Sequence, residues 1–307
     1  MSTAEPLENE RIGVVVLNYN NAEDSIRCLD CLMGADLSIF LVDNSSTDDS
    51  QDVLQKYVDE NKARNVMFLR NEFNLGYAGG NNAGIRAALD ADCSYICILN
   101  NDTLLDPLAL YGLAGFLADN QECGFVGPVL LEDDGTLDTV QSAGARIDLW
   151  TGRTPPNHRG ESFQMVEGRI RCDYIGGACM MFRASDIDRL GFIPEEYFLF
   201  FEETEWCLRA SRTGLASYCC TDYAIVHRGS ASIKQQRGLA EYLLARNRIR
   251  FVMRNGNVLQ VAACFACYTV RSIVREMADR DGSIRCVGYM IDGIRDVFRE
   301  PYKSFIA

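Results

Sequence analysis

Asp102 is the residue whose place in the sequence most clearly indicates chemistry. It follows an apolar run at residues 96–99 and two asparagines, Asn100 and Asn101. An apolar run that stops at polar residues is typical of a buried strand ending at the carboxyl edge of a sheet, where open α/β sheets bind ligands. A carboxylate there can hold a divalent cation against phosphate groups, but it can also begin the next helix.

Three further acids stand among aromatic residues in the segment 200–206. Glu202, Glu203 and Glu205 neighbour two phenylalanines and a tryptophan. Apolar neighbours desolvate a carboxylate, which raises its pKa and makes it a usable general base. In a helix, Glu202 and Glu205 would share one face and Glu203 would point elsewhere. The alternative is a solvated first turn, which the helix dipole favours.

His227 ends another apolar run, at residues 223–226, as Asp102 does. Imidazole is a good metal ligand, although a single histidine more often has a structural role.

The segment 74–84 contains four glycines and three asparagines. This composition disfavours an isolated helix, so the chain must pass close to a ligand or pack a helix very closely. Free N–H groups at the start of such a helix would suit phosphate or sugar oxygens, and a structural turn is the alternative. A dinucleotide fingerprint and a Walker P-loop are both excluded, because no glycine follows the first strand at 18–21 and no Gly-Lys-Ser/Thr occurs.

The elements that must position these residues alternate between strand and helix up to about residue 125. Apolar runs that end in polar residues predict strands at 12–17, 38–42, 66–69, 95–99 and 125–131. Helical spacing and capping residues predict helices at 22–33, from 47–50, around 83–89 and from Asp106. The pattern is typical of a doubly wound, mostly parallel sheet.

The pattern is less regular after Glu132. Residues 132–171 are rich in Gly, Asp, Thr and Pro, which predicts a long loop region over the binding edge. Regular structure is expected again at 172–182, with a helix at 198–212 and an extended segment at 216–226. The last part predicts three helices with basic faces, at 239–255, 258–277 and 284–298.

The charge of the chain is unevenly distributed. The net charge is −13, yet residues 228–307 carry 14 Lys and Arg against 7 Asp and Glu. This asymmetry indicates that the last quarter faces something anionic, and docking onto the acidic body of the protein is the alternative.

The composition also bears on location. The 307 residues are 48% hydrophobic, enough for one large core and an appendage. Residues 1–10 lack the order of a signal peptide, and no apolar stretch reaches the about 18 residues of a spanning helix, so we expect a cytoplasmic protein. The thirteen cysteines fit a reducing compartment as small buried hydrophobes. The CxxC pairs are too far apart, with too few histidines nearby, for a zinc site.

Taken in order, seven stretches resemble family 2 glycosyltransferases, and most of all the rhamnosyltransferase-like enzymes of bacterial surface polysaccharide synthesis. They lie at residues 14–20, 42–48, 74–84, 99–103, 176–179, 198–203 and 226–227. The resemblance implies a GT-A fold, which is an α/β fold with a Rossmann-like, mostly parallel sheet flanked by helices. It also implies inverting transfer of a sugar from a nucleotide-diphosphate-sugar, in the synthesis of a cell-surface polysaccharide.

The resemblance assigns roles to particular residues. Glu203 matches the catalytic base, with Glu202 beside it, while Asp102 and His227 match residues that hold Mg²⁺ or Mn²⁺. The residues expected to bind the nucleotide-sugar are Asn18, Tyr19, Asp43, Asn44, Asn74, Gly76, Asn82 and Asn101.

Two residues depart from the family pattern. Asn100 stands where the D-x-D motif has its first acid, so metal binding depends on Asp102. Glu203 stands where the base is usually Asp, and its extra methylene moves the carboxylate by about one bond. Glu202 or Glu205 therefore stays an alternative base. These departures also keep open an inactive GT-A-like domain that binds a nucleotide-sugar or a partner without turnover.

We expect residues 1–237 to form the catalytic domain, with a nucleotide-sugar half at about 11–130 and an acceptor half at about 131–237. Residues 238–307 would be a basic helical extension. The expected partners are a dTDP- or UDP-linked donor carrying rhamnose or a hexose and a glycan or polyprenyl-diphosphate-linked acceptor, and no nucleic acid. The apolar stretch 258–267 is too short to span a bilayer and indicates contact with a membrane surface, here the inner face of the plasma membrane. Packing on the catalytic domain or on a second copy in a homo-oligomer is the alternative.

Overall fold

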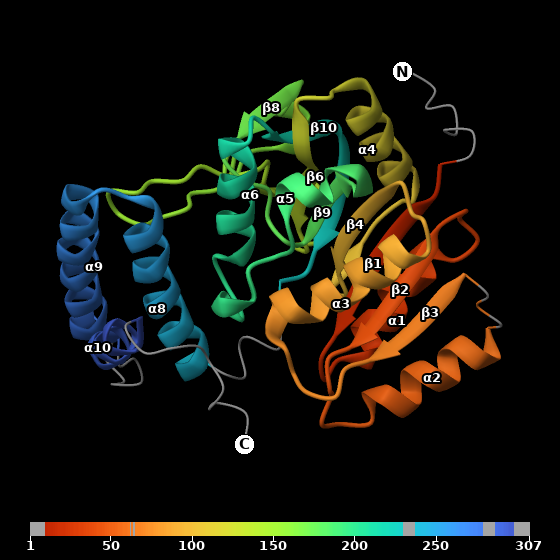
Figure 1. The fold of residues 1–307 in the computed structure, drawn as a ribbon, viewed down its shortest axis with the longest axis horizontal. Helices are drawn as coiled ribbons and strands as arrows, with labels where there is room; N and C mark the ends of the chain where they lie inside the picture. The colour runs from red at the N-terminus through yellow and green to blue at the C-terminus, as the bar shows by residue number, and fades with distance from the viewer. Residues whose placement is uncertain (1–9, 62, 64, 230–236, 279–285, 298–307) are drawn as a thin grey trace.

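The computed structural model of the chain describes residues 10–61, 63, 65–229, 237–278 and 286–297. Within these residues ten strands form one sheet, with the order β3-β2-β1-β4-β9-β6-β10-β5, β7 beside β6 and β8 beside β10 (Figure 1). The strands are β1 (Ile12–Asn18), β2 (Ser38–Asp43), β3 (Val66–Arg70), β4 (Tyr95–Asn100), β5 (Thr103–Leu104), β6 (Cys123–Glu132), β7 (Val140–Ser142), β8 (Arg169–Cys172), β9 (Cys179–Arg183) and β10 (Ala216–His227). Strands β3, β2, β1 and β4 pair in parallel, which confirms the predicted mostly parallel sheet.

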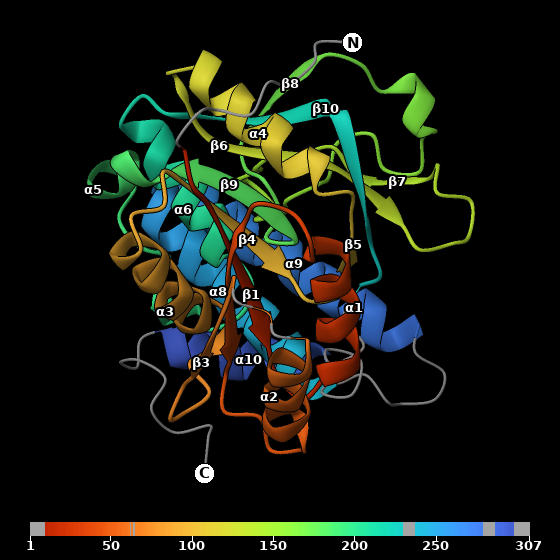
Figure 2. The same ribbon diagram turned by 90° about the vertical axis from the view of Figure 1, so that its right-hand side faces the viewer.

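Helices cover both faces of this sheet. The α-helices are α1 (Ala22–Leu32), α2 (Ser50–Glu60), α3 (Gly76–Asp90), α4 (Leu108–Asp119), α5 (Ile187–Leu190), α6 (Glu202–Arg212), α8 (Arg237–Asn255), α9 (Val258–Ala278) and α10 (Cys286–Val297). Because side chains alternate along a strand, Val14 and Val16 pack with α1, α2 and α4, while Val15 packs with α3 and α6. Figure 2 shows α1 and α2 on one side of β1 and α3 on the other.

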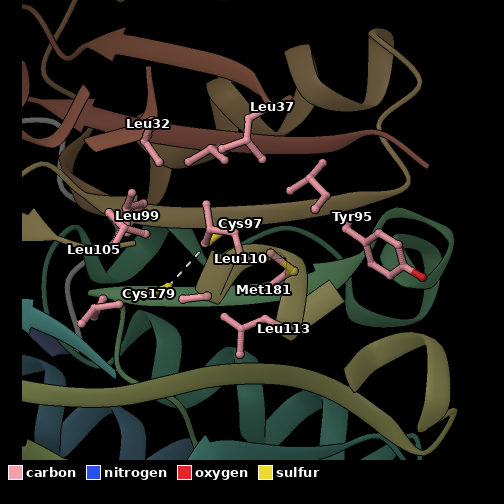
Figure 3. Packing of buried hydrophobic residues seen from close by; sticks show 14 of the residues in the cluster. Leu32, Leu37, Tyr95, Cys97, Leu99, Leu105, Leu110, Leu113, Cys179 and Met181 are labelled. Atoms are coloured by element: carbon pink, nitrogen blue, oxygen red, sulfur yellow. Dashed lines mark hydrogen bonds between the residues drawn. The ribbon is translucent and has the colours of Figure 1, made fainter. Parts of the chain in front are cut away.

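Cysteines are part of this core. The Sγ atoms of Cys97 in β4 and Cys179 in β9 lie 3.7 Å apart among leucines and Met181 (Figure 3). Twelve cysteines whose side chains the structure describes are free thiols, and ten of these are buried. Burial raises the pKa of the Cys28 thiol to about 12, so this thiol stays protonated and packs as an apolar group.

The glycine-rich helix α3 owes its composition to close packing. A Cβ atom at Gly84 would overlap Val15 of β1, and one at Gly80 would overlap Leu17. The first two N–H groups of the helix are not free for a phosphate. Gly76 N donates to Asn74 Oδ1 over 2.9 Å, and Tyr77 N donates to the carbonyl of Phe198 over 2.7 Å. Of the two predicted roles, close helix packing is the one that the structure supports.

Two expectations about the middle of the chain are wrong. The predicted loop at 132–171 contains two short strands, β7 and β8, which pair with β6 and β10. These strands have three and four residues, too few for an alternating pattern to be visible. The predicted helix at 198–212 begins only at Glu202, after a 3₁₀ turn (Glu195–Tyr197) and a loop at 198–201 with left-handed backbone angles.

The three C-terminal helices lie together on one side of the molecule (Figure 1). The arginines of α8 contact the body of the protein at the 3₁₀ turn. Arg250 donates to the carbonyl of Glu196 over 2.6 Å, and Arg254 forms an ion pair with the Glu196 carboxylate. Docking of the basic segment onto the acidic body, the predicted alternative, is therefore confirmed for α8.

Helix α9 corrects the expectation that no segment is long enough to span a membrane. It has 21 residues, and an 18-residue window in it has a mean hydropathy of 1.3 with 11% of the window buried. The apolar pattern continues past Cys267, where the sequence interpretation ended it. By length and composition this helix alone, among the described residues, reaches the threshold for a spanning segment.

Candidate active site

A first pocket opens at the carboxyl edge of the parallel strands. It holds six of the predicted site residues: Tyr19, Asn44, Asn74, Gly76, Asn101 and Asp102. Asn44, which is buried, donates from Nδ2 to Asn74 Oδ1 over 2.9 Å and to the carbonyl of Gly76 over 3.0 Å. These bonds fix the loop after β2 against the start of α3. Helix α8 closes the pocket with Leu239 and Ala240.

The other three predicted nucleotide-binding residues lie outside the walls of this pocket. Asn18, Asp43 and Asn82 are fully buried. Asp43 accepts hydrogen bonds from Asn18 Nδ2 at 2.9 Å, from Gln51 Nε2 at 2.7 Å, and from the backbone N–H and hydroxyl of Ser46. Asn82 holds both the N–H and the carbonyl of Ile193. In this structure these side chains hold loops together, and their contact with a nucleotide stays a prediction.

Asp102 and His227 are brought together by the sheet. His227, the last residue of β10, pairs with Thr103 of β5, which directly follows Asp102. The Oδ1 atom of Asp102 lies 3.3 Å from Nε2 of His227 and has no hydrogen-bond donor. Asp102 is only 7% exposed, so its Oδ1 is a buried hydrogen-bond acceptor without a donor. Its neighbour, Nε2 of His227, is either a second acceptor or a ligand of the same cation.

Gln141 of β7 determines which nitrogen of His227 carries a proton. Its Nε2 faces two groups that only accept, the carboxylate of Glu132 at 3.1 Å and the carbonyl of His227 at 3.3 Å. Its Oε1 therefore faces His227 Nδ1, 2.7 Å away, and that nitrogen must donate. The lone pair of a neutral His227 is then on Nε2, which lies 3.3 Å from Asp102 Oδ1 and 3.4 Å from Nδ2 of Asn100. Asn100 can donate to this nitrogen, but the approach of Nε2 to the Asp102 oxygen is favourable only with a proton or a metal cation between them.

A second pocket adjoins the first one, and Tyr77, Asn100 and Leu199 belong to the walls of both. It contains Glu202, Glu203 and His227, together with side chains from the irregular region after β6: Gln141, Thr154, Arg159 and Tyr174. Asp102 thus lines the first pocket, while His227 and the paired acids line the adjoining second pocket.

Glu202 is buried, and the next residue, Glu203, is half-buried. One oxygen of each, Oε2, is buried without a hydrogen-bond partner. Burial raises the pKa of both carboxyls, and the charge of Glu203 raises the pKa of Glu202 further. Backbone N–H groups oppose this rise in pKa at both carboxyls, that of Gly177 among them for Glu203. The added effect of the neighbouring charge favours the proton on Glu202, and the role of Glu203 as the base stays a prediction.

The prediction that Glu202 and Glu205 share one helical face, with Glu203 pointing elsewhere, does not describe this site correctly. Glu202 and Glu203 both line the second pocket, because they are the first two residues of α6 and the turn begins there. Glu205 does not line it. Its Oε2 accepts from the Tyr197 hydroxyl at 2.8 Å and from Asn255 Nδ2 at 2.7 Å. Glu205 is thereby disfavoured as an alternative base.

The sequence interpretation missed four residues of the second pocket. The hydroxyl of Tyr77 donates to the carbonyl of Gly177 over 2.6 Å. Tyr77 lies inside the glycine-rich segment, so the sequence offered a reason to expect it at the site. Gln141, Arg159 and Tyr174 come from a region without periodicity, and only the tertiary fold brings them to the pocket.

The donor set suits a divalent cation with few protein ligands. Among the described residues no group of three or more His, Cys, Asp and Glu is arranged to hold a metal. Asp102 of the first pocket and His227 of the second could supply two ligands. This number is typical of Mg²⁺-type ions that take their remaining ligands from water and substrate phosphates.

Comparisons with known proteins agree with this arrangement. The family model described as glycosyl transferase family 2 matches residues 13–191. The low-salt glycan biosynthesis hexosyltransferase Agl10 of Haloferax volcanii is 24% identical over 224 residues, which cover 70% of this chain and 66% of that protein. The dTDP-rhamnosyl transferase RfbF of Shigella flexneri is 24% identical over 234 residues, covering 74% and 72%.

A solved structure is similar in fold. It is the mannosyltransferase PcManGT from Pyrobaculum calidifontis, in complex with GDP-Man and Mn²⁺, with a TM-score of 0.59 and 13% identity. The match covers 95% of this chain and 88% of that chain. The likeness confirms the predicted GT-A fold.

Proposed function

The chain belongs to glycosyl transferase family 2, and we propose that it transfers rhamnose or a hexose from a nucleotide-diphosphate-sugar, with inversion, to a glycan or lipid-linked acceptor in the synthesis of a cell-surface polysaccharide. One observation carries this proposal. Two connected pockets each contain buried, unpartnered carboxylate oxygens, Asp102 Oδ1 in the first and those of Glu202 and Glu203 in the second. The curated relatives, named as a hexosyltransferase and a dTDP-rhamnosyl transferase, support the substrate class.

The reaction follows from the placement of the two pockets. The donor occupies the first pocket, with its diphosphate near Asp102, and the acceptor enters the second. Glu203 takes the proton of the acceptor hydroxyl, whose oxygen attacks the anomeric carbon as the bond to the diphosphate breaks. Because one oxygen displaces another from the opposite side, the configuration inverts. The neutral carboxyl of Glu202 keeps a second negative charge away from the base.

Asp102 and His227 would hold Mg²⁺ or Mn²⁺, and the unpartnered Oδ1 beside a ring nitrogen supports this assignment. When bound, the cation stabilises the negative charge that develops on the leaving diphosphate. Mn²⁺ in the complex of the mannosyltransferase named above supports the choice of metal.

Gln141→Leu tests whether the fixed orientation of His227 matters. The leucine removes the acceptor for Nδ1, so the proton can move to Nε2 and block that nitrogen. We expect the affinity for Mn²⁺ in the presence of dTDP to fall about 10- to 100-fold, as measured by electron paramagnetic resonance of free Mn²⁺. Gln121→Leu, a change at an exposed side chain outside both pockets, should leave Mn²⁺ binding intact. Equal Mn²⁺ affinity in the wild type and Gln141→Leu would contradict this role.

A panel of donors tests the function itself. The purified protein is mixed with dTDP-rhamnose, UDP-linked hexoses and GDP-mannose, each with and without Mn²⁺, and release of nucleoside diphosphate is followed. We expect turnover with one donor class and only with metal. Clear binding of a donor without any turnover would instead favour an inactive domain that binds a nucleotide-sugar. This is the alternative that Asn100 and Glu203, which depart from the family pattern, leave possible.

The cellular setting is part of the same proposal. A polyprenyl-diphosphate-linked acceptor would place the protein in the cytoplasm at the inner face of the plasma membrane. The exposed apolar side chains of α9, Val258, Leu259, Val270, Val274 and Met277, support contact of this segment with a membrane. The same side chains would suit a second copy of the chain, so the oligomeric state in solution distinguishes the two.

A further inference from the structure

The loop that leads into the paired acids has an unusual backbone. Phe198, Phe200 and Phe201 have φ angles of 66°, 72° and 73°, in the left-handed region that bulky side chains rarely adopt. Leu199 N donates to the carbonyl of Tyr197 over 2.8 Å, which closes a tight turn. Glu202 and Glu203 follow directly, so the direction of both carboxyls depends on this loop. Such a conformation persists only where the surroundings enforce it.

Asn247 of α8 makes most of the hydrogen bonds that hold the loop in this conformation. Its side chain is fully buried, and the two N–H groups of its Nδ2 are shared among three carbonyls of the loop region, those of Tyr197 at 2.9 Å, Leu199 at 2.7 Å and Phe200 at 2.9 Å. Carbonyl oxygens only accept, so the amide nitrogen must be the atom that faces them. One side chain thus binds three of the four carbonyls from residue 197 to residue 200.

Arg246 holds the amide of Asn247 in that orientation. Its Nε donates to Asn247 Oδ1 over 2.9 Å, and its guanidinium also donates to the carbonyl of Tyr197 over 2.9 Å. On the other side of the loop, Tyr77 N donates to the carbonyl of Phe198 over 2.7 Å. The loop is therefore fixed between the first turn of α3 and the middle of α8.

Apolar contacts also connect the loop with α8. Phe198 packs with Tyr242 and Leu243 of α8, and the rings of Phe201 and Phe251 lie 5.5 Å apart. Removing the hydrogen bonds of Asn247 would leave the rings in contact with α8 but would free the backbone between them to adopt ordinary φ angles.

We propose that Asn247 is a positioning residue for sugar transfer, which directs the Glu202–Glu203 pair into the second pocket by holding the loop at 198–201. This rests on the proposed function. The C-terminal extension is then part of the catalytic apparatus, because the base is set by a side chain from α8. Asn247 does not line the first pocket, and the loop reaches it only through Phe198 and Leu199, so donor binding depends mainly on the polar residues there.

Asn247→Asp tests the proposal with almost no change in size. The carboxylate cannot donate to the three carbonyls, so the loop loses its restraint. We expect kcat for the donor that turns over in the panel to fall about 100-fold, the effect of a misplacement of roughly 1 Å. The Kd for dTDP with Mn²⁺ should change much less than kcat, because the loop adds only Phe198 and Leu199 to the walls of the first pocket. Backbone amides at 198–206 should exchange hydrogen faster than in the wild type, by mass spectrometry, while β1 and β4 exchange as before.

Asn120→Asp is the matched control. Asn120 is also buried and donates to a carbonyl, that of Phe116 at 2.6 Å, but it lies outside both pockets. It should lower the melting temperature without changing kcat or exchange at 198–206. If Asn247→Asp does not fold, Arg246→Met decides, because it leaves Asn247 in place without the N–H that orients its amide. We expect a smaller loss of kcat and faster exchange at 198–206.

Wild-type kcat and exchange in a folded Asn247→Asp, or in Arg246→Met where that variant decides, would overturn the proposal. An equal loss of kcat in Asn120→Asp would overturn it as well. A wild-type protein that turns over no donor overturns the proposed function instead, and the exchange at 198–206 then still decides whether Asn247 holds the loop.

Discussion

Glu203→Gln is expected to lower the rate of sugar transfer by about 10²- to 10⁴-fold, the usual contribution of a positioned general base. The amide has nearly the same size and cannot accept the proton of the acceptor hydroxyl. The donor lies in the first pocket, so its binding should be unchanged. Initial rates of transfer, together with calorimetric titration of dTDP and Mn²⁺, measure the two effects separately.

Glu202→Gln is the matched control, because glutamine resembles the protonated carboxyl that we infer for Glu202. It should retain most of the activity. Burial raises the pKa of Glu202, so the folded state favours the protonated acid and is penalised when pH rises and the acid ionises. Glu202→Gln should therefore melt at or above the wild-type temperature near neutral pH. If Glu202→Gln loses sugar transfer and Glu203→Gln does not, Glu202 is the base and the assignment to Glu203 is wrong.

The pH dependence of transfer gives a second test of the same assignment. Only the ionised base accepts a proton, and burial raises the pKa of Glu203. The rate should therefore fall on acidification already above the pH range in which an exposed glutamate, with a pKa of about 4.3, takes up its proton. An acid limb at or below that range would contradict a buried carboxylate base.

Asp102→Asn is expected to abolish the metal dependence of donor binding. The amide keeps the shape of the side chain but replaces a charged ligand, which should weaken Mn²⁺ binding about 100-fold or more, since even residues behind the ligands contribute 10- to 100-fold. The affinity for dTDP in the presence of Mn²⁺ should then equal the affinity without metal. Paramagnetic resonance of Mn²⁺ provides a readout that does not depend on turnover.

Asp106→Asn is the control for this change. Asp106 is an exposed acid four residues further along the same chain segment, and its Oδ1 caps α4 by accepting from Leu108 N over 2.9 Å. This variant should bind Mn²⁺ as the wild type does. If Asp102→Asn and Asp106→Asn behave alike, the metal is held elsewhere.

Most of the fold could be predicted because strand ends are visible in the sequence. Each apolar run that stops at polar residues, as at Asn18, Asp43 and Asn100, is a strand in the structure and ends at the same edge of the sheet. The position of Asp102 follows from that rule alone. Its nearness to His227 does not, because it depends on the antiparallel pairing of β10 with the two-residue strand β5.

The supporting residues could not be predicted for a different reason. Gln141 and Asn247 act through side-chain amides whose partners are distant in sequence, 86 residues away for His227 and 47 to 50 for the loop carbonyls. Neither amide belongs to a periodic pattern. The left-handed angles at Phe198 and Phe201 are also invisible, because these residues are poor candidates for positive φ. A helix is expected from residue 198, but it begins only at Glu202, because tertiary contacts of the loop outweigh the helix propensity of its residues.

The central claim is that the carboxyl edge of the sheet binds a donor diphosphate through a cation held by Asp102 and His227. Crystals grown with dTDP and Mn²⁺ test it most directly, by anomalous scattering at the manganese edge. We predict one anomalous peak in contact with Asp102 Oδ1 and His227 Nε2, with the diphosphate beside it. Nucleotide bound in the first pocket with no manganese at these two atoms would contradict the account.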